Sequence, residues 1–172
     1  TDYISNYYLE KLNPAAKILN LDSLMTVKNI KSLDDLRLKK VDLLDYDYII
    51  LPGYLIKQLP NNSIDVFINT RSFMEMNTET VKFYFAQIHR TINKGGIFYC
   101  VNRYEKKTSG DTIKIKKFPF DEKWSFEISR KSFSQPLIHE ALLRRTRLKN
   151  YKLRKELMRL KPYDVEFFRS WV

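Results

Sequence analysis

The stretch Ile64-Asp65-Val66-Phe67-Ile68-Asn69-Thr70 decides the fold class, because it predicts a buried β-strand directly after the turn-forming residues 60–63. Apolar residues then recur on one stripe from 78 to 93, which predicts an amphipathic helix. The apolar run 97–101 predicts the next strand. A strand, a helix and a strand with short links form a βαβ unit with parallel strands, so the sequence indicates an α/β protein.

Further strands are predicted on both sides of this unit. Residues 48–51 predict a short buried strand that enters a Pro-Gly turn, and residues 17–21 predict another. Residues 113–118 and 124–129 alternate between apolar and polar side chains, which predicts a β-hairpin.

The composition excludes several classes of protein. The 172 residues are 44% hydrophobic and 30% charged, as in a globular protein rather than a disordered one. The single cysteine, Cys100, excludes an intramolecular disulfide framework, and it favours a cytoplasmic location. No cluster of carboxylates, histidines or cysteines has the spacing of a metal site, so we expect no metal. No glycine precedes Gly53, which excludes a Gly-rich phosphate loop from the first 52 residues.

Residues 141–161 carry most of the net charge of +11, with nine basic side chains and one acid. This pattern predicts one long basic helix that ends before Pro162 and belongs to a C-terminal extension at 141–172. The charge suits a nucleic-acid backbone, although no base-reading element accompanies it and no specific nucleic acid is expected. A stripe formed by Leu153, Leu157 and Leu160 would alternatively suit an anionic membrane surface. A solvated helix without a partner is the third interpretation.

Several segments of the chain resemble known methyltransferases. Residues 59–68 combine a Leu-Pro pair, a polar turn and a hydrophobic-Asp-hydrophobic strand, and they resemble the fourth-strand region of class I S-adenosylmethionine-dependent methyltransferases. Residues 67–76, 95–104 and 132–140 are similar to the sugar O-methyltransferases of that class. The resemblance covers about residues 1–146 and implies a Rossmann-like sheet. It also implies S-adenosylmethionine as methyl donor and a saccharide or glycan hydroxyl as acceptor.

The chain also departs from that family. Its members bind the methionine part of the donor with a Gly-rich loop after their first strand, and an acidic residue after the second strand holds the ribose. No such loop can precede Gly53, so the resemblance implies a partial methyltransferase domain at 1–140 without the first two strands. We therefore expect this chain alone to bind S-adenosylmethionine weakly or not at all. We also expect its open sheet edges to pair with the missing half or with a second copy of the chain.

Ligands of open α/β sheets bind at the carboxyl ends of the strands, which places the candidate binding residues. The resemblance implies that Pro52 and Tyr54 contact the adenine of the donor, and we add Asn69, Thr70 and Arg71 as further cofactor-binding candidates. The candidate substrate-binding residues are Asn102, Arg103 and Tyr104, because amides, guanidinium groups and aromatic faces hold sugars. The alternatives are a plain turn with Tyr54 packed, solvated strand ends, and an ion pair at Arg103.

The candidate catalytic residues are His139 and Glu75. Only ten residues, 103–112, separate two predicted strands, whereas a parallel crossover needs about a dozen, so the second strand should run antiparallel. The strand at 124–129 then points back and delivers His139 to the carboxyl edge, where it could remove a hydroxyl proton. Glu75 could orient the same hydroxyl or accept its proton. A packed histidine and an exposed loop acid are the alternatives.

Overall fold

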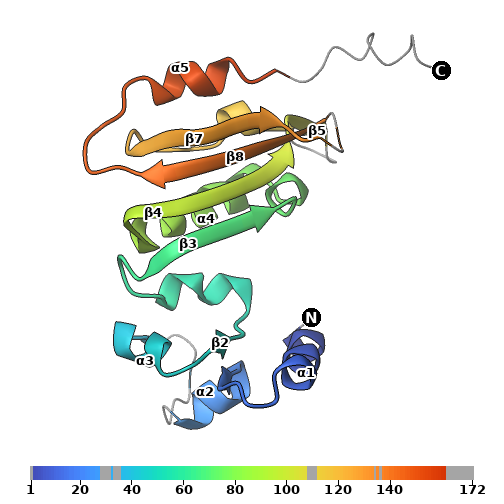
Figure 1. Ribbon diagram of the computed structural model, residues 1–172, viewed down its shortest axis with the longest axis vertical. Helices are drawn as coiled ribbons and strands as arrows, with labels where there is room; N and C mark the ends of the chain where they lie inside the picture. The colour runs from blue at the N-terminus through green and yellow to red at the C-terminus, as the bar shows by residue number, and fades with distance from the viewer. Residues whose placement is uncertain are drawn as a thin grey trace, which may run out of the picture. The chain divides into compact units, whose positions relative to one another are not determined.

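The computed structural model describes residues 2–27, 32, 36–107, 112–133, 135 and 137–161, in a mixed α/β arrangement (Figure 1). The chain divides into two compact units, residues 1–63 and residues 64–172.

The first unit packs short elements around five buried leucines. Its helices are α1 (Asp2–Leu12), α2 (Leu21–Val27) and α3 (Lys40–Leu44), with a 3₁₀ helix η2 (Gly53–Gln58) at the end. The strands β1 (Ile18–Leu19) and β2 (Tyr48–Ile49) pair in parallel, which confirms both predicted strands although each is only two residues long. The buried leucines are Leu19, Leu24, Leu36, Leu38 and Leu55.

The second unit is a four-stranded sheet in the order β3-β4-β8-β7, visible at the centre of Figure 1. β3 (Ile64–Thr70) pairs in parallel with β4 (Ile92–Arg103), and β8 (Ile138–Arg145) pairs antiparallel with both β4 and β7 (Trp124–Lys131). Three strands therefore point one way and β8 points the other way. The predicted α/β class is confirmed for this unit, and within the described residues β3 and β7 are the edges of its sheet.

The predicted βαβ unit is confirmed, with one change of boundary. Helix α4 (Thr78–Thr91) joins β3 to β4, and the side chain of Asn77 caps it by accepting a hydrogen bond from the Thr80 N–H at 2.8 Å. The helix ends two residues before the expected position, and β4 begins directly at Ile92. The glycines expected after the helix lie inside β4, where Gly95 has a φ of +84° and the pairing with β3 shifts register.

The predicted hairpin between 113–118 and 124–129 is wrong. β6 (Thr112–Lys114) pairs with β5 (Glu105–Lys107), and the 3₁₀ helix η4 (Ile115–Lys117) follows it. β7 pairs instead with β8, a segment whose Ala and Leu residues favour a helix by propensity alone. Burial decides against the helix, since Ala141 and Leu143 are buried on one face of the sheet while Arg144 is exposed.

The predicted long basic helix at 141–161 is also wrong. Residues up to Arg145 belong to β8, a strand that continues across the domain boundary expected after residue 140. Helix α5 spans only Leu153–Met158. Leu153 and Leu157 are buried in the core of the second unit, and Leu160 packs against it. The apolar stripe therefore packs into the protein's own core. Residues 162–172 of the predicted extension lie outside the described residues.

Aromatic side chains fill the core between the sheet and α4. Phe85 of α4 contacts Phe98 of β4, with ring centroids 5.9 Å apart. It also contacts Phe118, the residue after η4, with ring centroids 5.4 Å apart. Trp124 at the start of β7 is fully buried beside Phe98. Because strand residues alternate between faces, Asn102 of β4 and His139 of β8 lie on the same face of the sheet as Phe98, nearer the carboxyl end of β4.

Candidate functional site

The carboxyl edge of the second unit brings together polar residues from β4, β7 and β8. Asn102 of β4 lies opposite His139 of β8, and His139 lies opposite Lys131 of β7. Asn102 and His139 are both buried, which is costly for polar side chains unless they are hydrogen-bonded. The sequence prediction that His139 reaches this edge is confirmed by the register, even though β7 pairs with a different strand than expected.

Two asparagines hold the loop that follows β3. Asn102 Nδ2 donates to Asn69 Oδ1 at 2.9 Å, and Asn102 Oδ1 accepts from the Met74 N–H at 3.3 Å. Asn69 Oδ1 also accepts from the Phe73 N–H at 3.4 Å, and Asn69 Nδ2 donates to Ser72. Both amides are therefore engaged within the protein, and they fix the loop that carries the exposed residues of this edge.

Thr70, the last residue of β3, and Arg71, the first residue of that loop, are both exposed. Arg71 has a φ of +65°, a left-handed conformation that is uncommon for a residue with a side chain. Its N–H donates to the Val101 carbonyl at 2.7 Å, so the backbone extends the pairing of β3 and β4 by one further bond. The other two cofactor candidates lie in the first unit, where Pro52 precedes η2 and Tyr54 exposes about half of its side chain.

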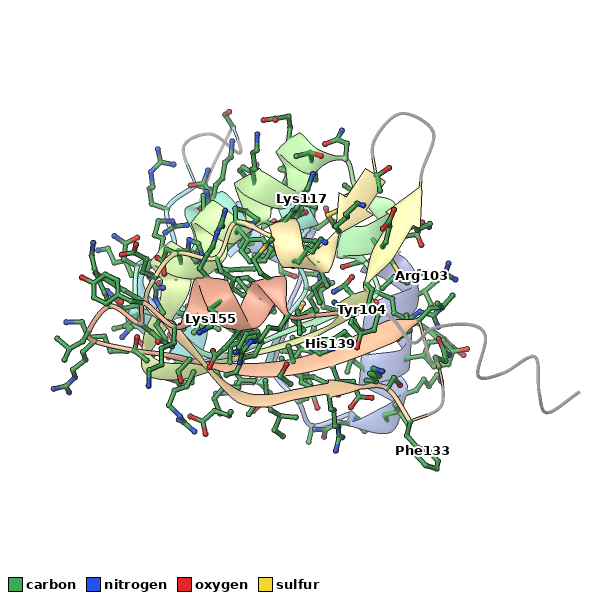
Figure 2. All side chains as sticks on the ribbon, turned by 90° about the horizontal axis from the view of Figure 1, so that it is seen from above. Arg103, Tyr104, Lys117, Phe133, His139 and Lys155 are labelled. Atoms are coloured by element: carbon green, nitrogen blue, oxygen red, sulfur yellow. The ribbon has the colours of Figure 1, made fainter. Side chains whose placement is uncertain are left out.

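His139 forms the centre of a buried hydrogen-bond chain. Its Nδ1 lies 2.8 Å from Tyr104 Oη, and its Nε2 lies 3.1 Å from Ser129 Oγ. His139 is 2% exposed and Tyr104 is 6% exposed, whereas Ser129 is exposed. Figure 2 shows Tyr104 and His139 side by side, while Phe133 of the β7–β8 loop points away from the protein.

Burial keeps the imidazole of His139 neutral. Loss of solvation lowers the pKa of His139 to about 4, and the nearby carboxylate of Glu140 opposes this shift only in part. A neutral imidazole has one N–H donor and one acceptor nitrogen. When Nδ1–H donates to Tyr104, Nε2 is left as an acceptor for the Ser129 hydroxyl.

The sequence pattern does not predict Ser129 at this site. A strict alternation along β7 would place Phe126, Ile128 and Arg130 on one face. The register shift between Phe126 and Ile128 moves Ser129 to the face of His139 instead. No sequence signal marks this bulge, so only the structure could bring Ser129 to the site.

Tyr104, Ser129 and His139 line a groove of about 520 Å³ between the end of β7 and the segment after α5. Four basic side chains also line this groove, and Glu156 is the one carboxylate among the lining residues. The basic residues are Arg130, Lys131, Arg159 and Lys161. Arg130 is paired with Glu140, with Nε and Oε2 2.8 Å apart.

Glu75 and Arg103, two further predicted site residues, do not line this groove. Glu75 is exposed and forms an ion pair with Lys106. Arg103 is half-buried and follows Asn102 on β4, so it lies on the opposite face of the sheet. The described residues contain no group of three potential metal ligands, and no described helix is long and apolar enough to cross a membrane.

Comparisons with known proteins give only distant likenesses. No protein-family model and no curated protein matches the chain. A candidate type 11 methyltransferase from Sulfolobus solfataricus is 15% identical, with a TM-score of 0.41 and coverage of 86% of this chain and 95% of that one. A candidate methyltransferase from Escherichia coli is 10% identical, with a TM-score of 0.37 and coverage of 85% and 86%.

A third solved structure comes from work on the conversion of a disulfide bond into a thioacetal group during echinomycin biosynthesis. It is 12% identical, with a TM-score of 0.40 and coverage of 92% of this chain and 88% of that chain. At these identities and TM-scores the likenesses decide neither family nor activity.

Proposed function

We propose that this chain is part of a methyltransferase that moves a methyl group from S-adenosylmethionine to a saccharide hydroxyl. The observation that carries the proposal is the Ser129–His139–Tyr104 chain, which ends in an exposed hydroxyl at the carboxyl edge of the sheet. The resemblance of residues 67–76, 95–104 and 132–140 to sugar O-methyltransferases supports the same reaction and suggests the saccharide.

The residues at the end of β3 fit part of the donor. Arg71 exposes a guanidinium group that can pair with the carboxylate of S-adenosylmethionine, and Thr70 exposes a hydroxyl beside it. The donor supplies, when bound, a methyl group on a positively charged sulfur.

The chain's own residues would orient the acceptor and take its proton. Ser129 Oγ accepts the proton of the acceptor hydroxyl, and the Ser129 proton passes to Nε2 of His139. When the donor is bound, the acceptor oxygen would form its bond to the donated methyl carbon, and the electron pair of the broken carbon–sulfur bond would stay on sulfur. The proton ends on Nε2 of His139, while the Nδ1–H of the same ring keeps its hydrogen bond to Tyr104 Oη.

A nucleic-acid or membrane-docking role has less support. The long basic helix on which both roles depended is interrupted by β8 and a turn. Leu153 and Leu157 pack in the core and are not available to a lipid surface.

The proposal can be tested with the whole natural protein and S-adenosylmethionine labelled in its methyl group. A panel of neutral and anionic saccharides serves as acceptors, and products are read by mass spectrometry and by the position of the label. We expect the label as a methyl ether on a saccharide oxygen. Label on nitrogen, on carbon or on no acceptor would contradict the proposal.

A further inference from the structure

The groove beside Ser129 has an excess of positive charge, which the proposed methyl transfer does not by itself require. Four basic side chains line it, one of which is paired with Glu140, and they outnumber the single lining carboxylate, Glu156. The chemistry of the groove matches a negatively charged ligand. Because Ser129 also lines it, a ligand held there would present its groups to the start of the His139 chain.

The basic residues reach the groove from two separate elements. Lys131 ends β7, whereas Arg159 and Lys161 follow α5. Leu153 and Leu157 anchor α5 in the core, so the segment with Arg159 is fixed against the sheet rather than held by charge alone. This arrangement places ammonium and guanidinium donors along the groove, the groups that bind phosphates and carboxylates in proteins.

The floor of the groove differs from an ordinary basic surface. Tyr104 and His139 are buried polar side chains with their hydrogen bonds made, and Phe126 contributes an apolar side chain to the lining. A sugar presents both hydroxyls and apolar ring faces, so this mixture of hydroxyl, aromatic and cationic groups suits a sugar that bears an anionic group.

We propose that this groove binds an anionic sugar, with its phosphate or carboxylate between Lys131 and Arg159 and one hydroxyl at Ser129. This inference rests on the proposed function for the role of the hydroxyl, but binding itself needs no methyl donor. The bound anion would also favour the protonated form of His139, which makes the imidazole a better proton acceptor during transfer.

The test measures binding without S-adenosylmethionine. The chain is titrated with glucose 6-phosphate, glucuronate, neutral glucose and inorganic phosphate, and binding is followed by shifts of backbone amide signals in NMR spectra. We expect both anionic sugars to bind at least tenfold more tightly than glucose, and the signals of Ser129 and Lys131 to shift. The ratio of the dissociation constants of glucose 6-phosphate and glucuronate identifies whether the groove prefers a phosphate or a carboxylate.

Two variants of equal charge locate the site. The double variant Lys131→Gln with Arg159→Gln should weaken binding of glucose 6-phosphate at least tenfold. The matched control Arg154→Gln with Lys155→Gln removes the same charge from exposed positions of α5 outside this groove, and its binding should stay within twofold of wild type. The amide spectrum of each variant reports that it is folded.

Two results would overturn the proposal: equal binding of glucose and glucose 6-phosphate, or equal losses in the two double variants. Binding of the anionic sugars without any methyl transfer by the whole protein would instead leave this inference standing and refute the proposed function.

Discussion

Tyr104 Oη lies 2.8 Å from Nδ1 of His139, and this contact joins the residue that follows β4 to the start of β8. Both side chains are buried, so the hydrogen bond holds the imidazole in one orientation. In the proposed reaction Tyr104 would therefore be a positioning residue that acts on the acceptor through His139 and Ser129.

The variant Tyr104→Phe tests this positioning role. It keeps the ring but removes the hydroxyl, so Nδ1 of His139 loses its partner. We expect methyl transfer to fall about tenfold or more, as loss of an oriented base does. The pH dependence of the rate should shift as well, because Tyr104 no longer favours one tautomer. A rate and pH profile equal to those of wild type would contradict the role.

The variant Asn102→Ala tests the pair of asparagines at the ends of β3 and β4. It leaves the Met74 N–H without its acceptor and Asn69 Oδ1 without one donor, inside the protein. We expect a loss of about 2 kcal/mol in the free energy of unfolding, measured with urea. The control Thr70→Ala, at an exposed position of the same edge, should change it by less than about 0.5 kcal/mol. Similar values for the two variants would contradict the account of the asparagine pair.

The pKa values of the protein's two histidines predict how stability depends on pH. Burial lowers the pKa of both His89 and His139 from 6.5 to about 4 in the folded state. Between these values the unfolded chain binds more protons, so stability is present above pH 6.5 and is lost as the pH falls toward 4. Each histidine contributes a slope of at most about 1.4 kcal/mol per pH unit.

Urea unfolding at a series of pH values measures that slope. The variant His139→Gln should reduce it over the same interval, since one titrating group is removed. An unchanged slope, in a variant that still unfolds cooperatively, would show that His139 is not neutral in the folded protein.

The partly buried ion pair of Arg145 should contribute more to the free energy of unfolding than an exposed ion pair does. Its guanidinium donates twice to the carboxylate of Asp121 and lies 5.0 Å from the ring of Trp124. The side chain is only 10% exposed, so Arg145→Met should cost about 2–3 kcal/mol of unfolding free energy. The exposed pair of Lys149 and Glu122 serves as control, and Lys149→Met should cost less than about 0.5 kcal/mol. Equal costs would contradict a structural role for Arg145.

The sequence predicted the elements whose pattern is local. The strand at Ile64–Thr70 and the capped helix after Asn77 follow from periodicity and from one capping side chain. Residues 141–145 form part of the helix predicted for 141–161, whereas the structure pairs them with two strands in β8, which is a tertiary effect. The position of His139 at the carboxyl edge followed from loop length, while Ser129 depended on a bulge without a sequence signal.

The most direct test of the account is single-turnover methyl transfer by the whole natural protein with ¹³C-methyl-labelled S-adenosylmethionine and its saccharide acceptor. We expect the ¹³C signal of a methyl ether on a sugar oxygen, and a rate at least about 100-fold lower for His139→Gln. NMR amide spectra confirm that the variant is folded. A folded His139→Gln variant that transfers the methyl group at the wild-type rate would contradict the account.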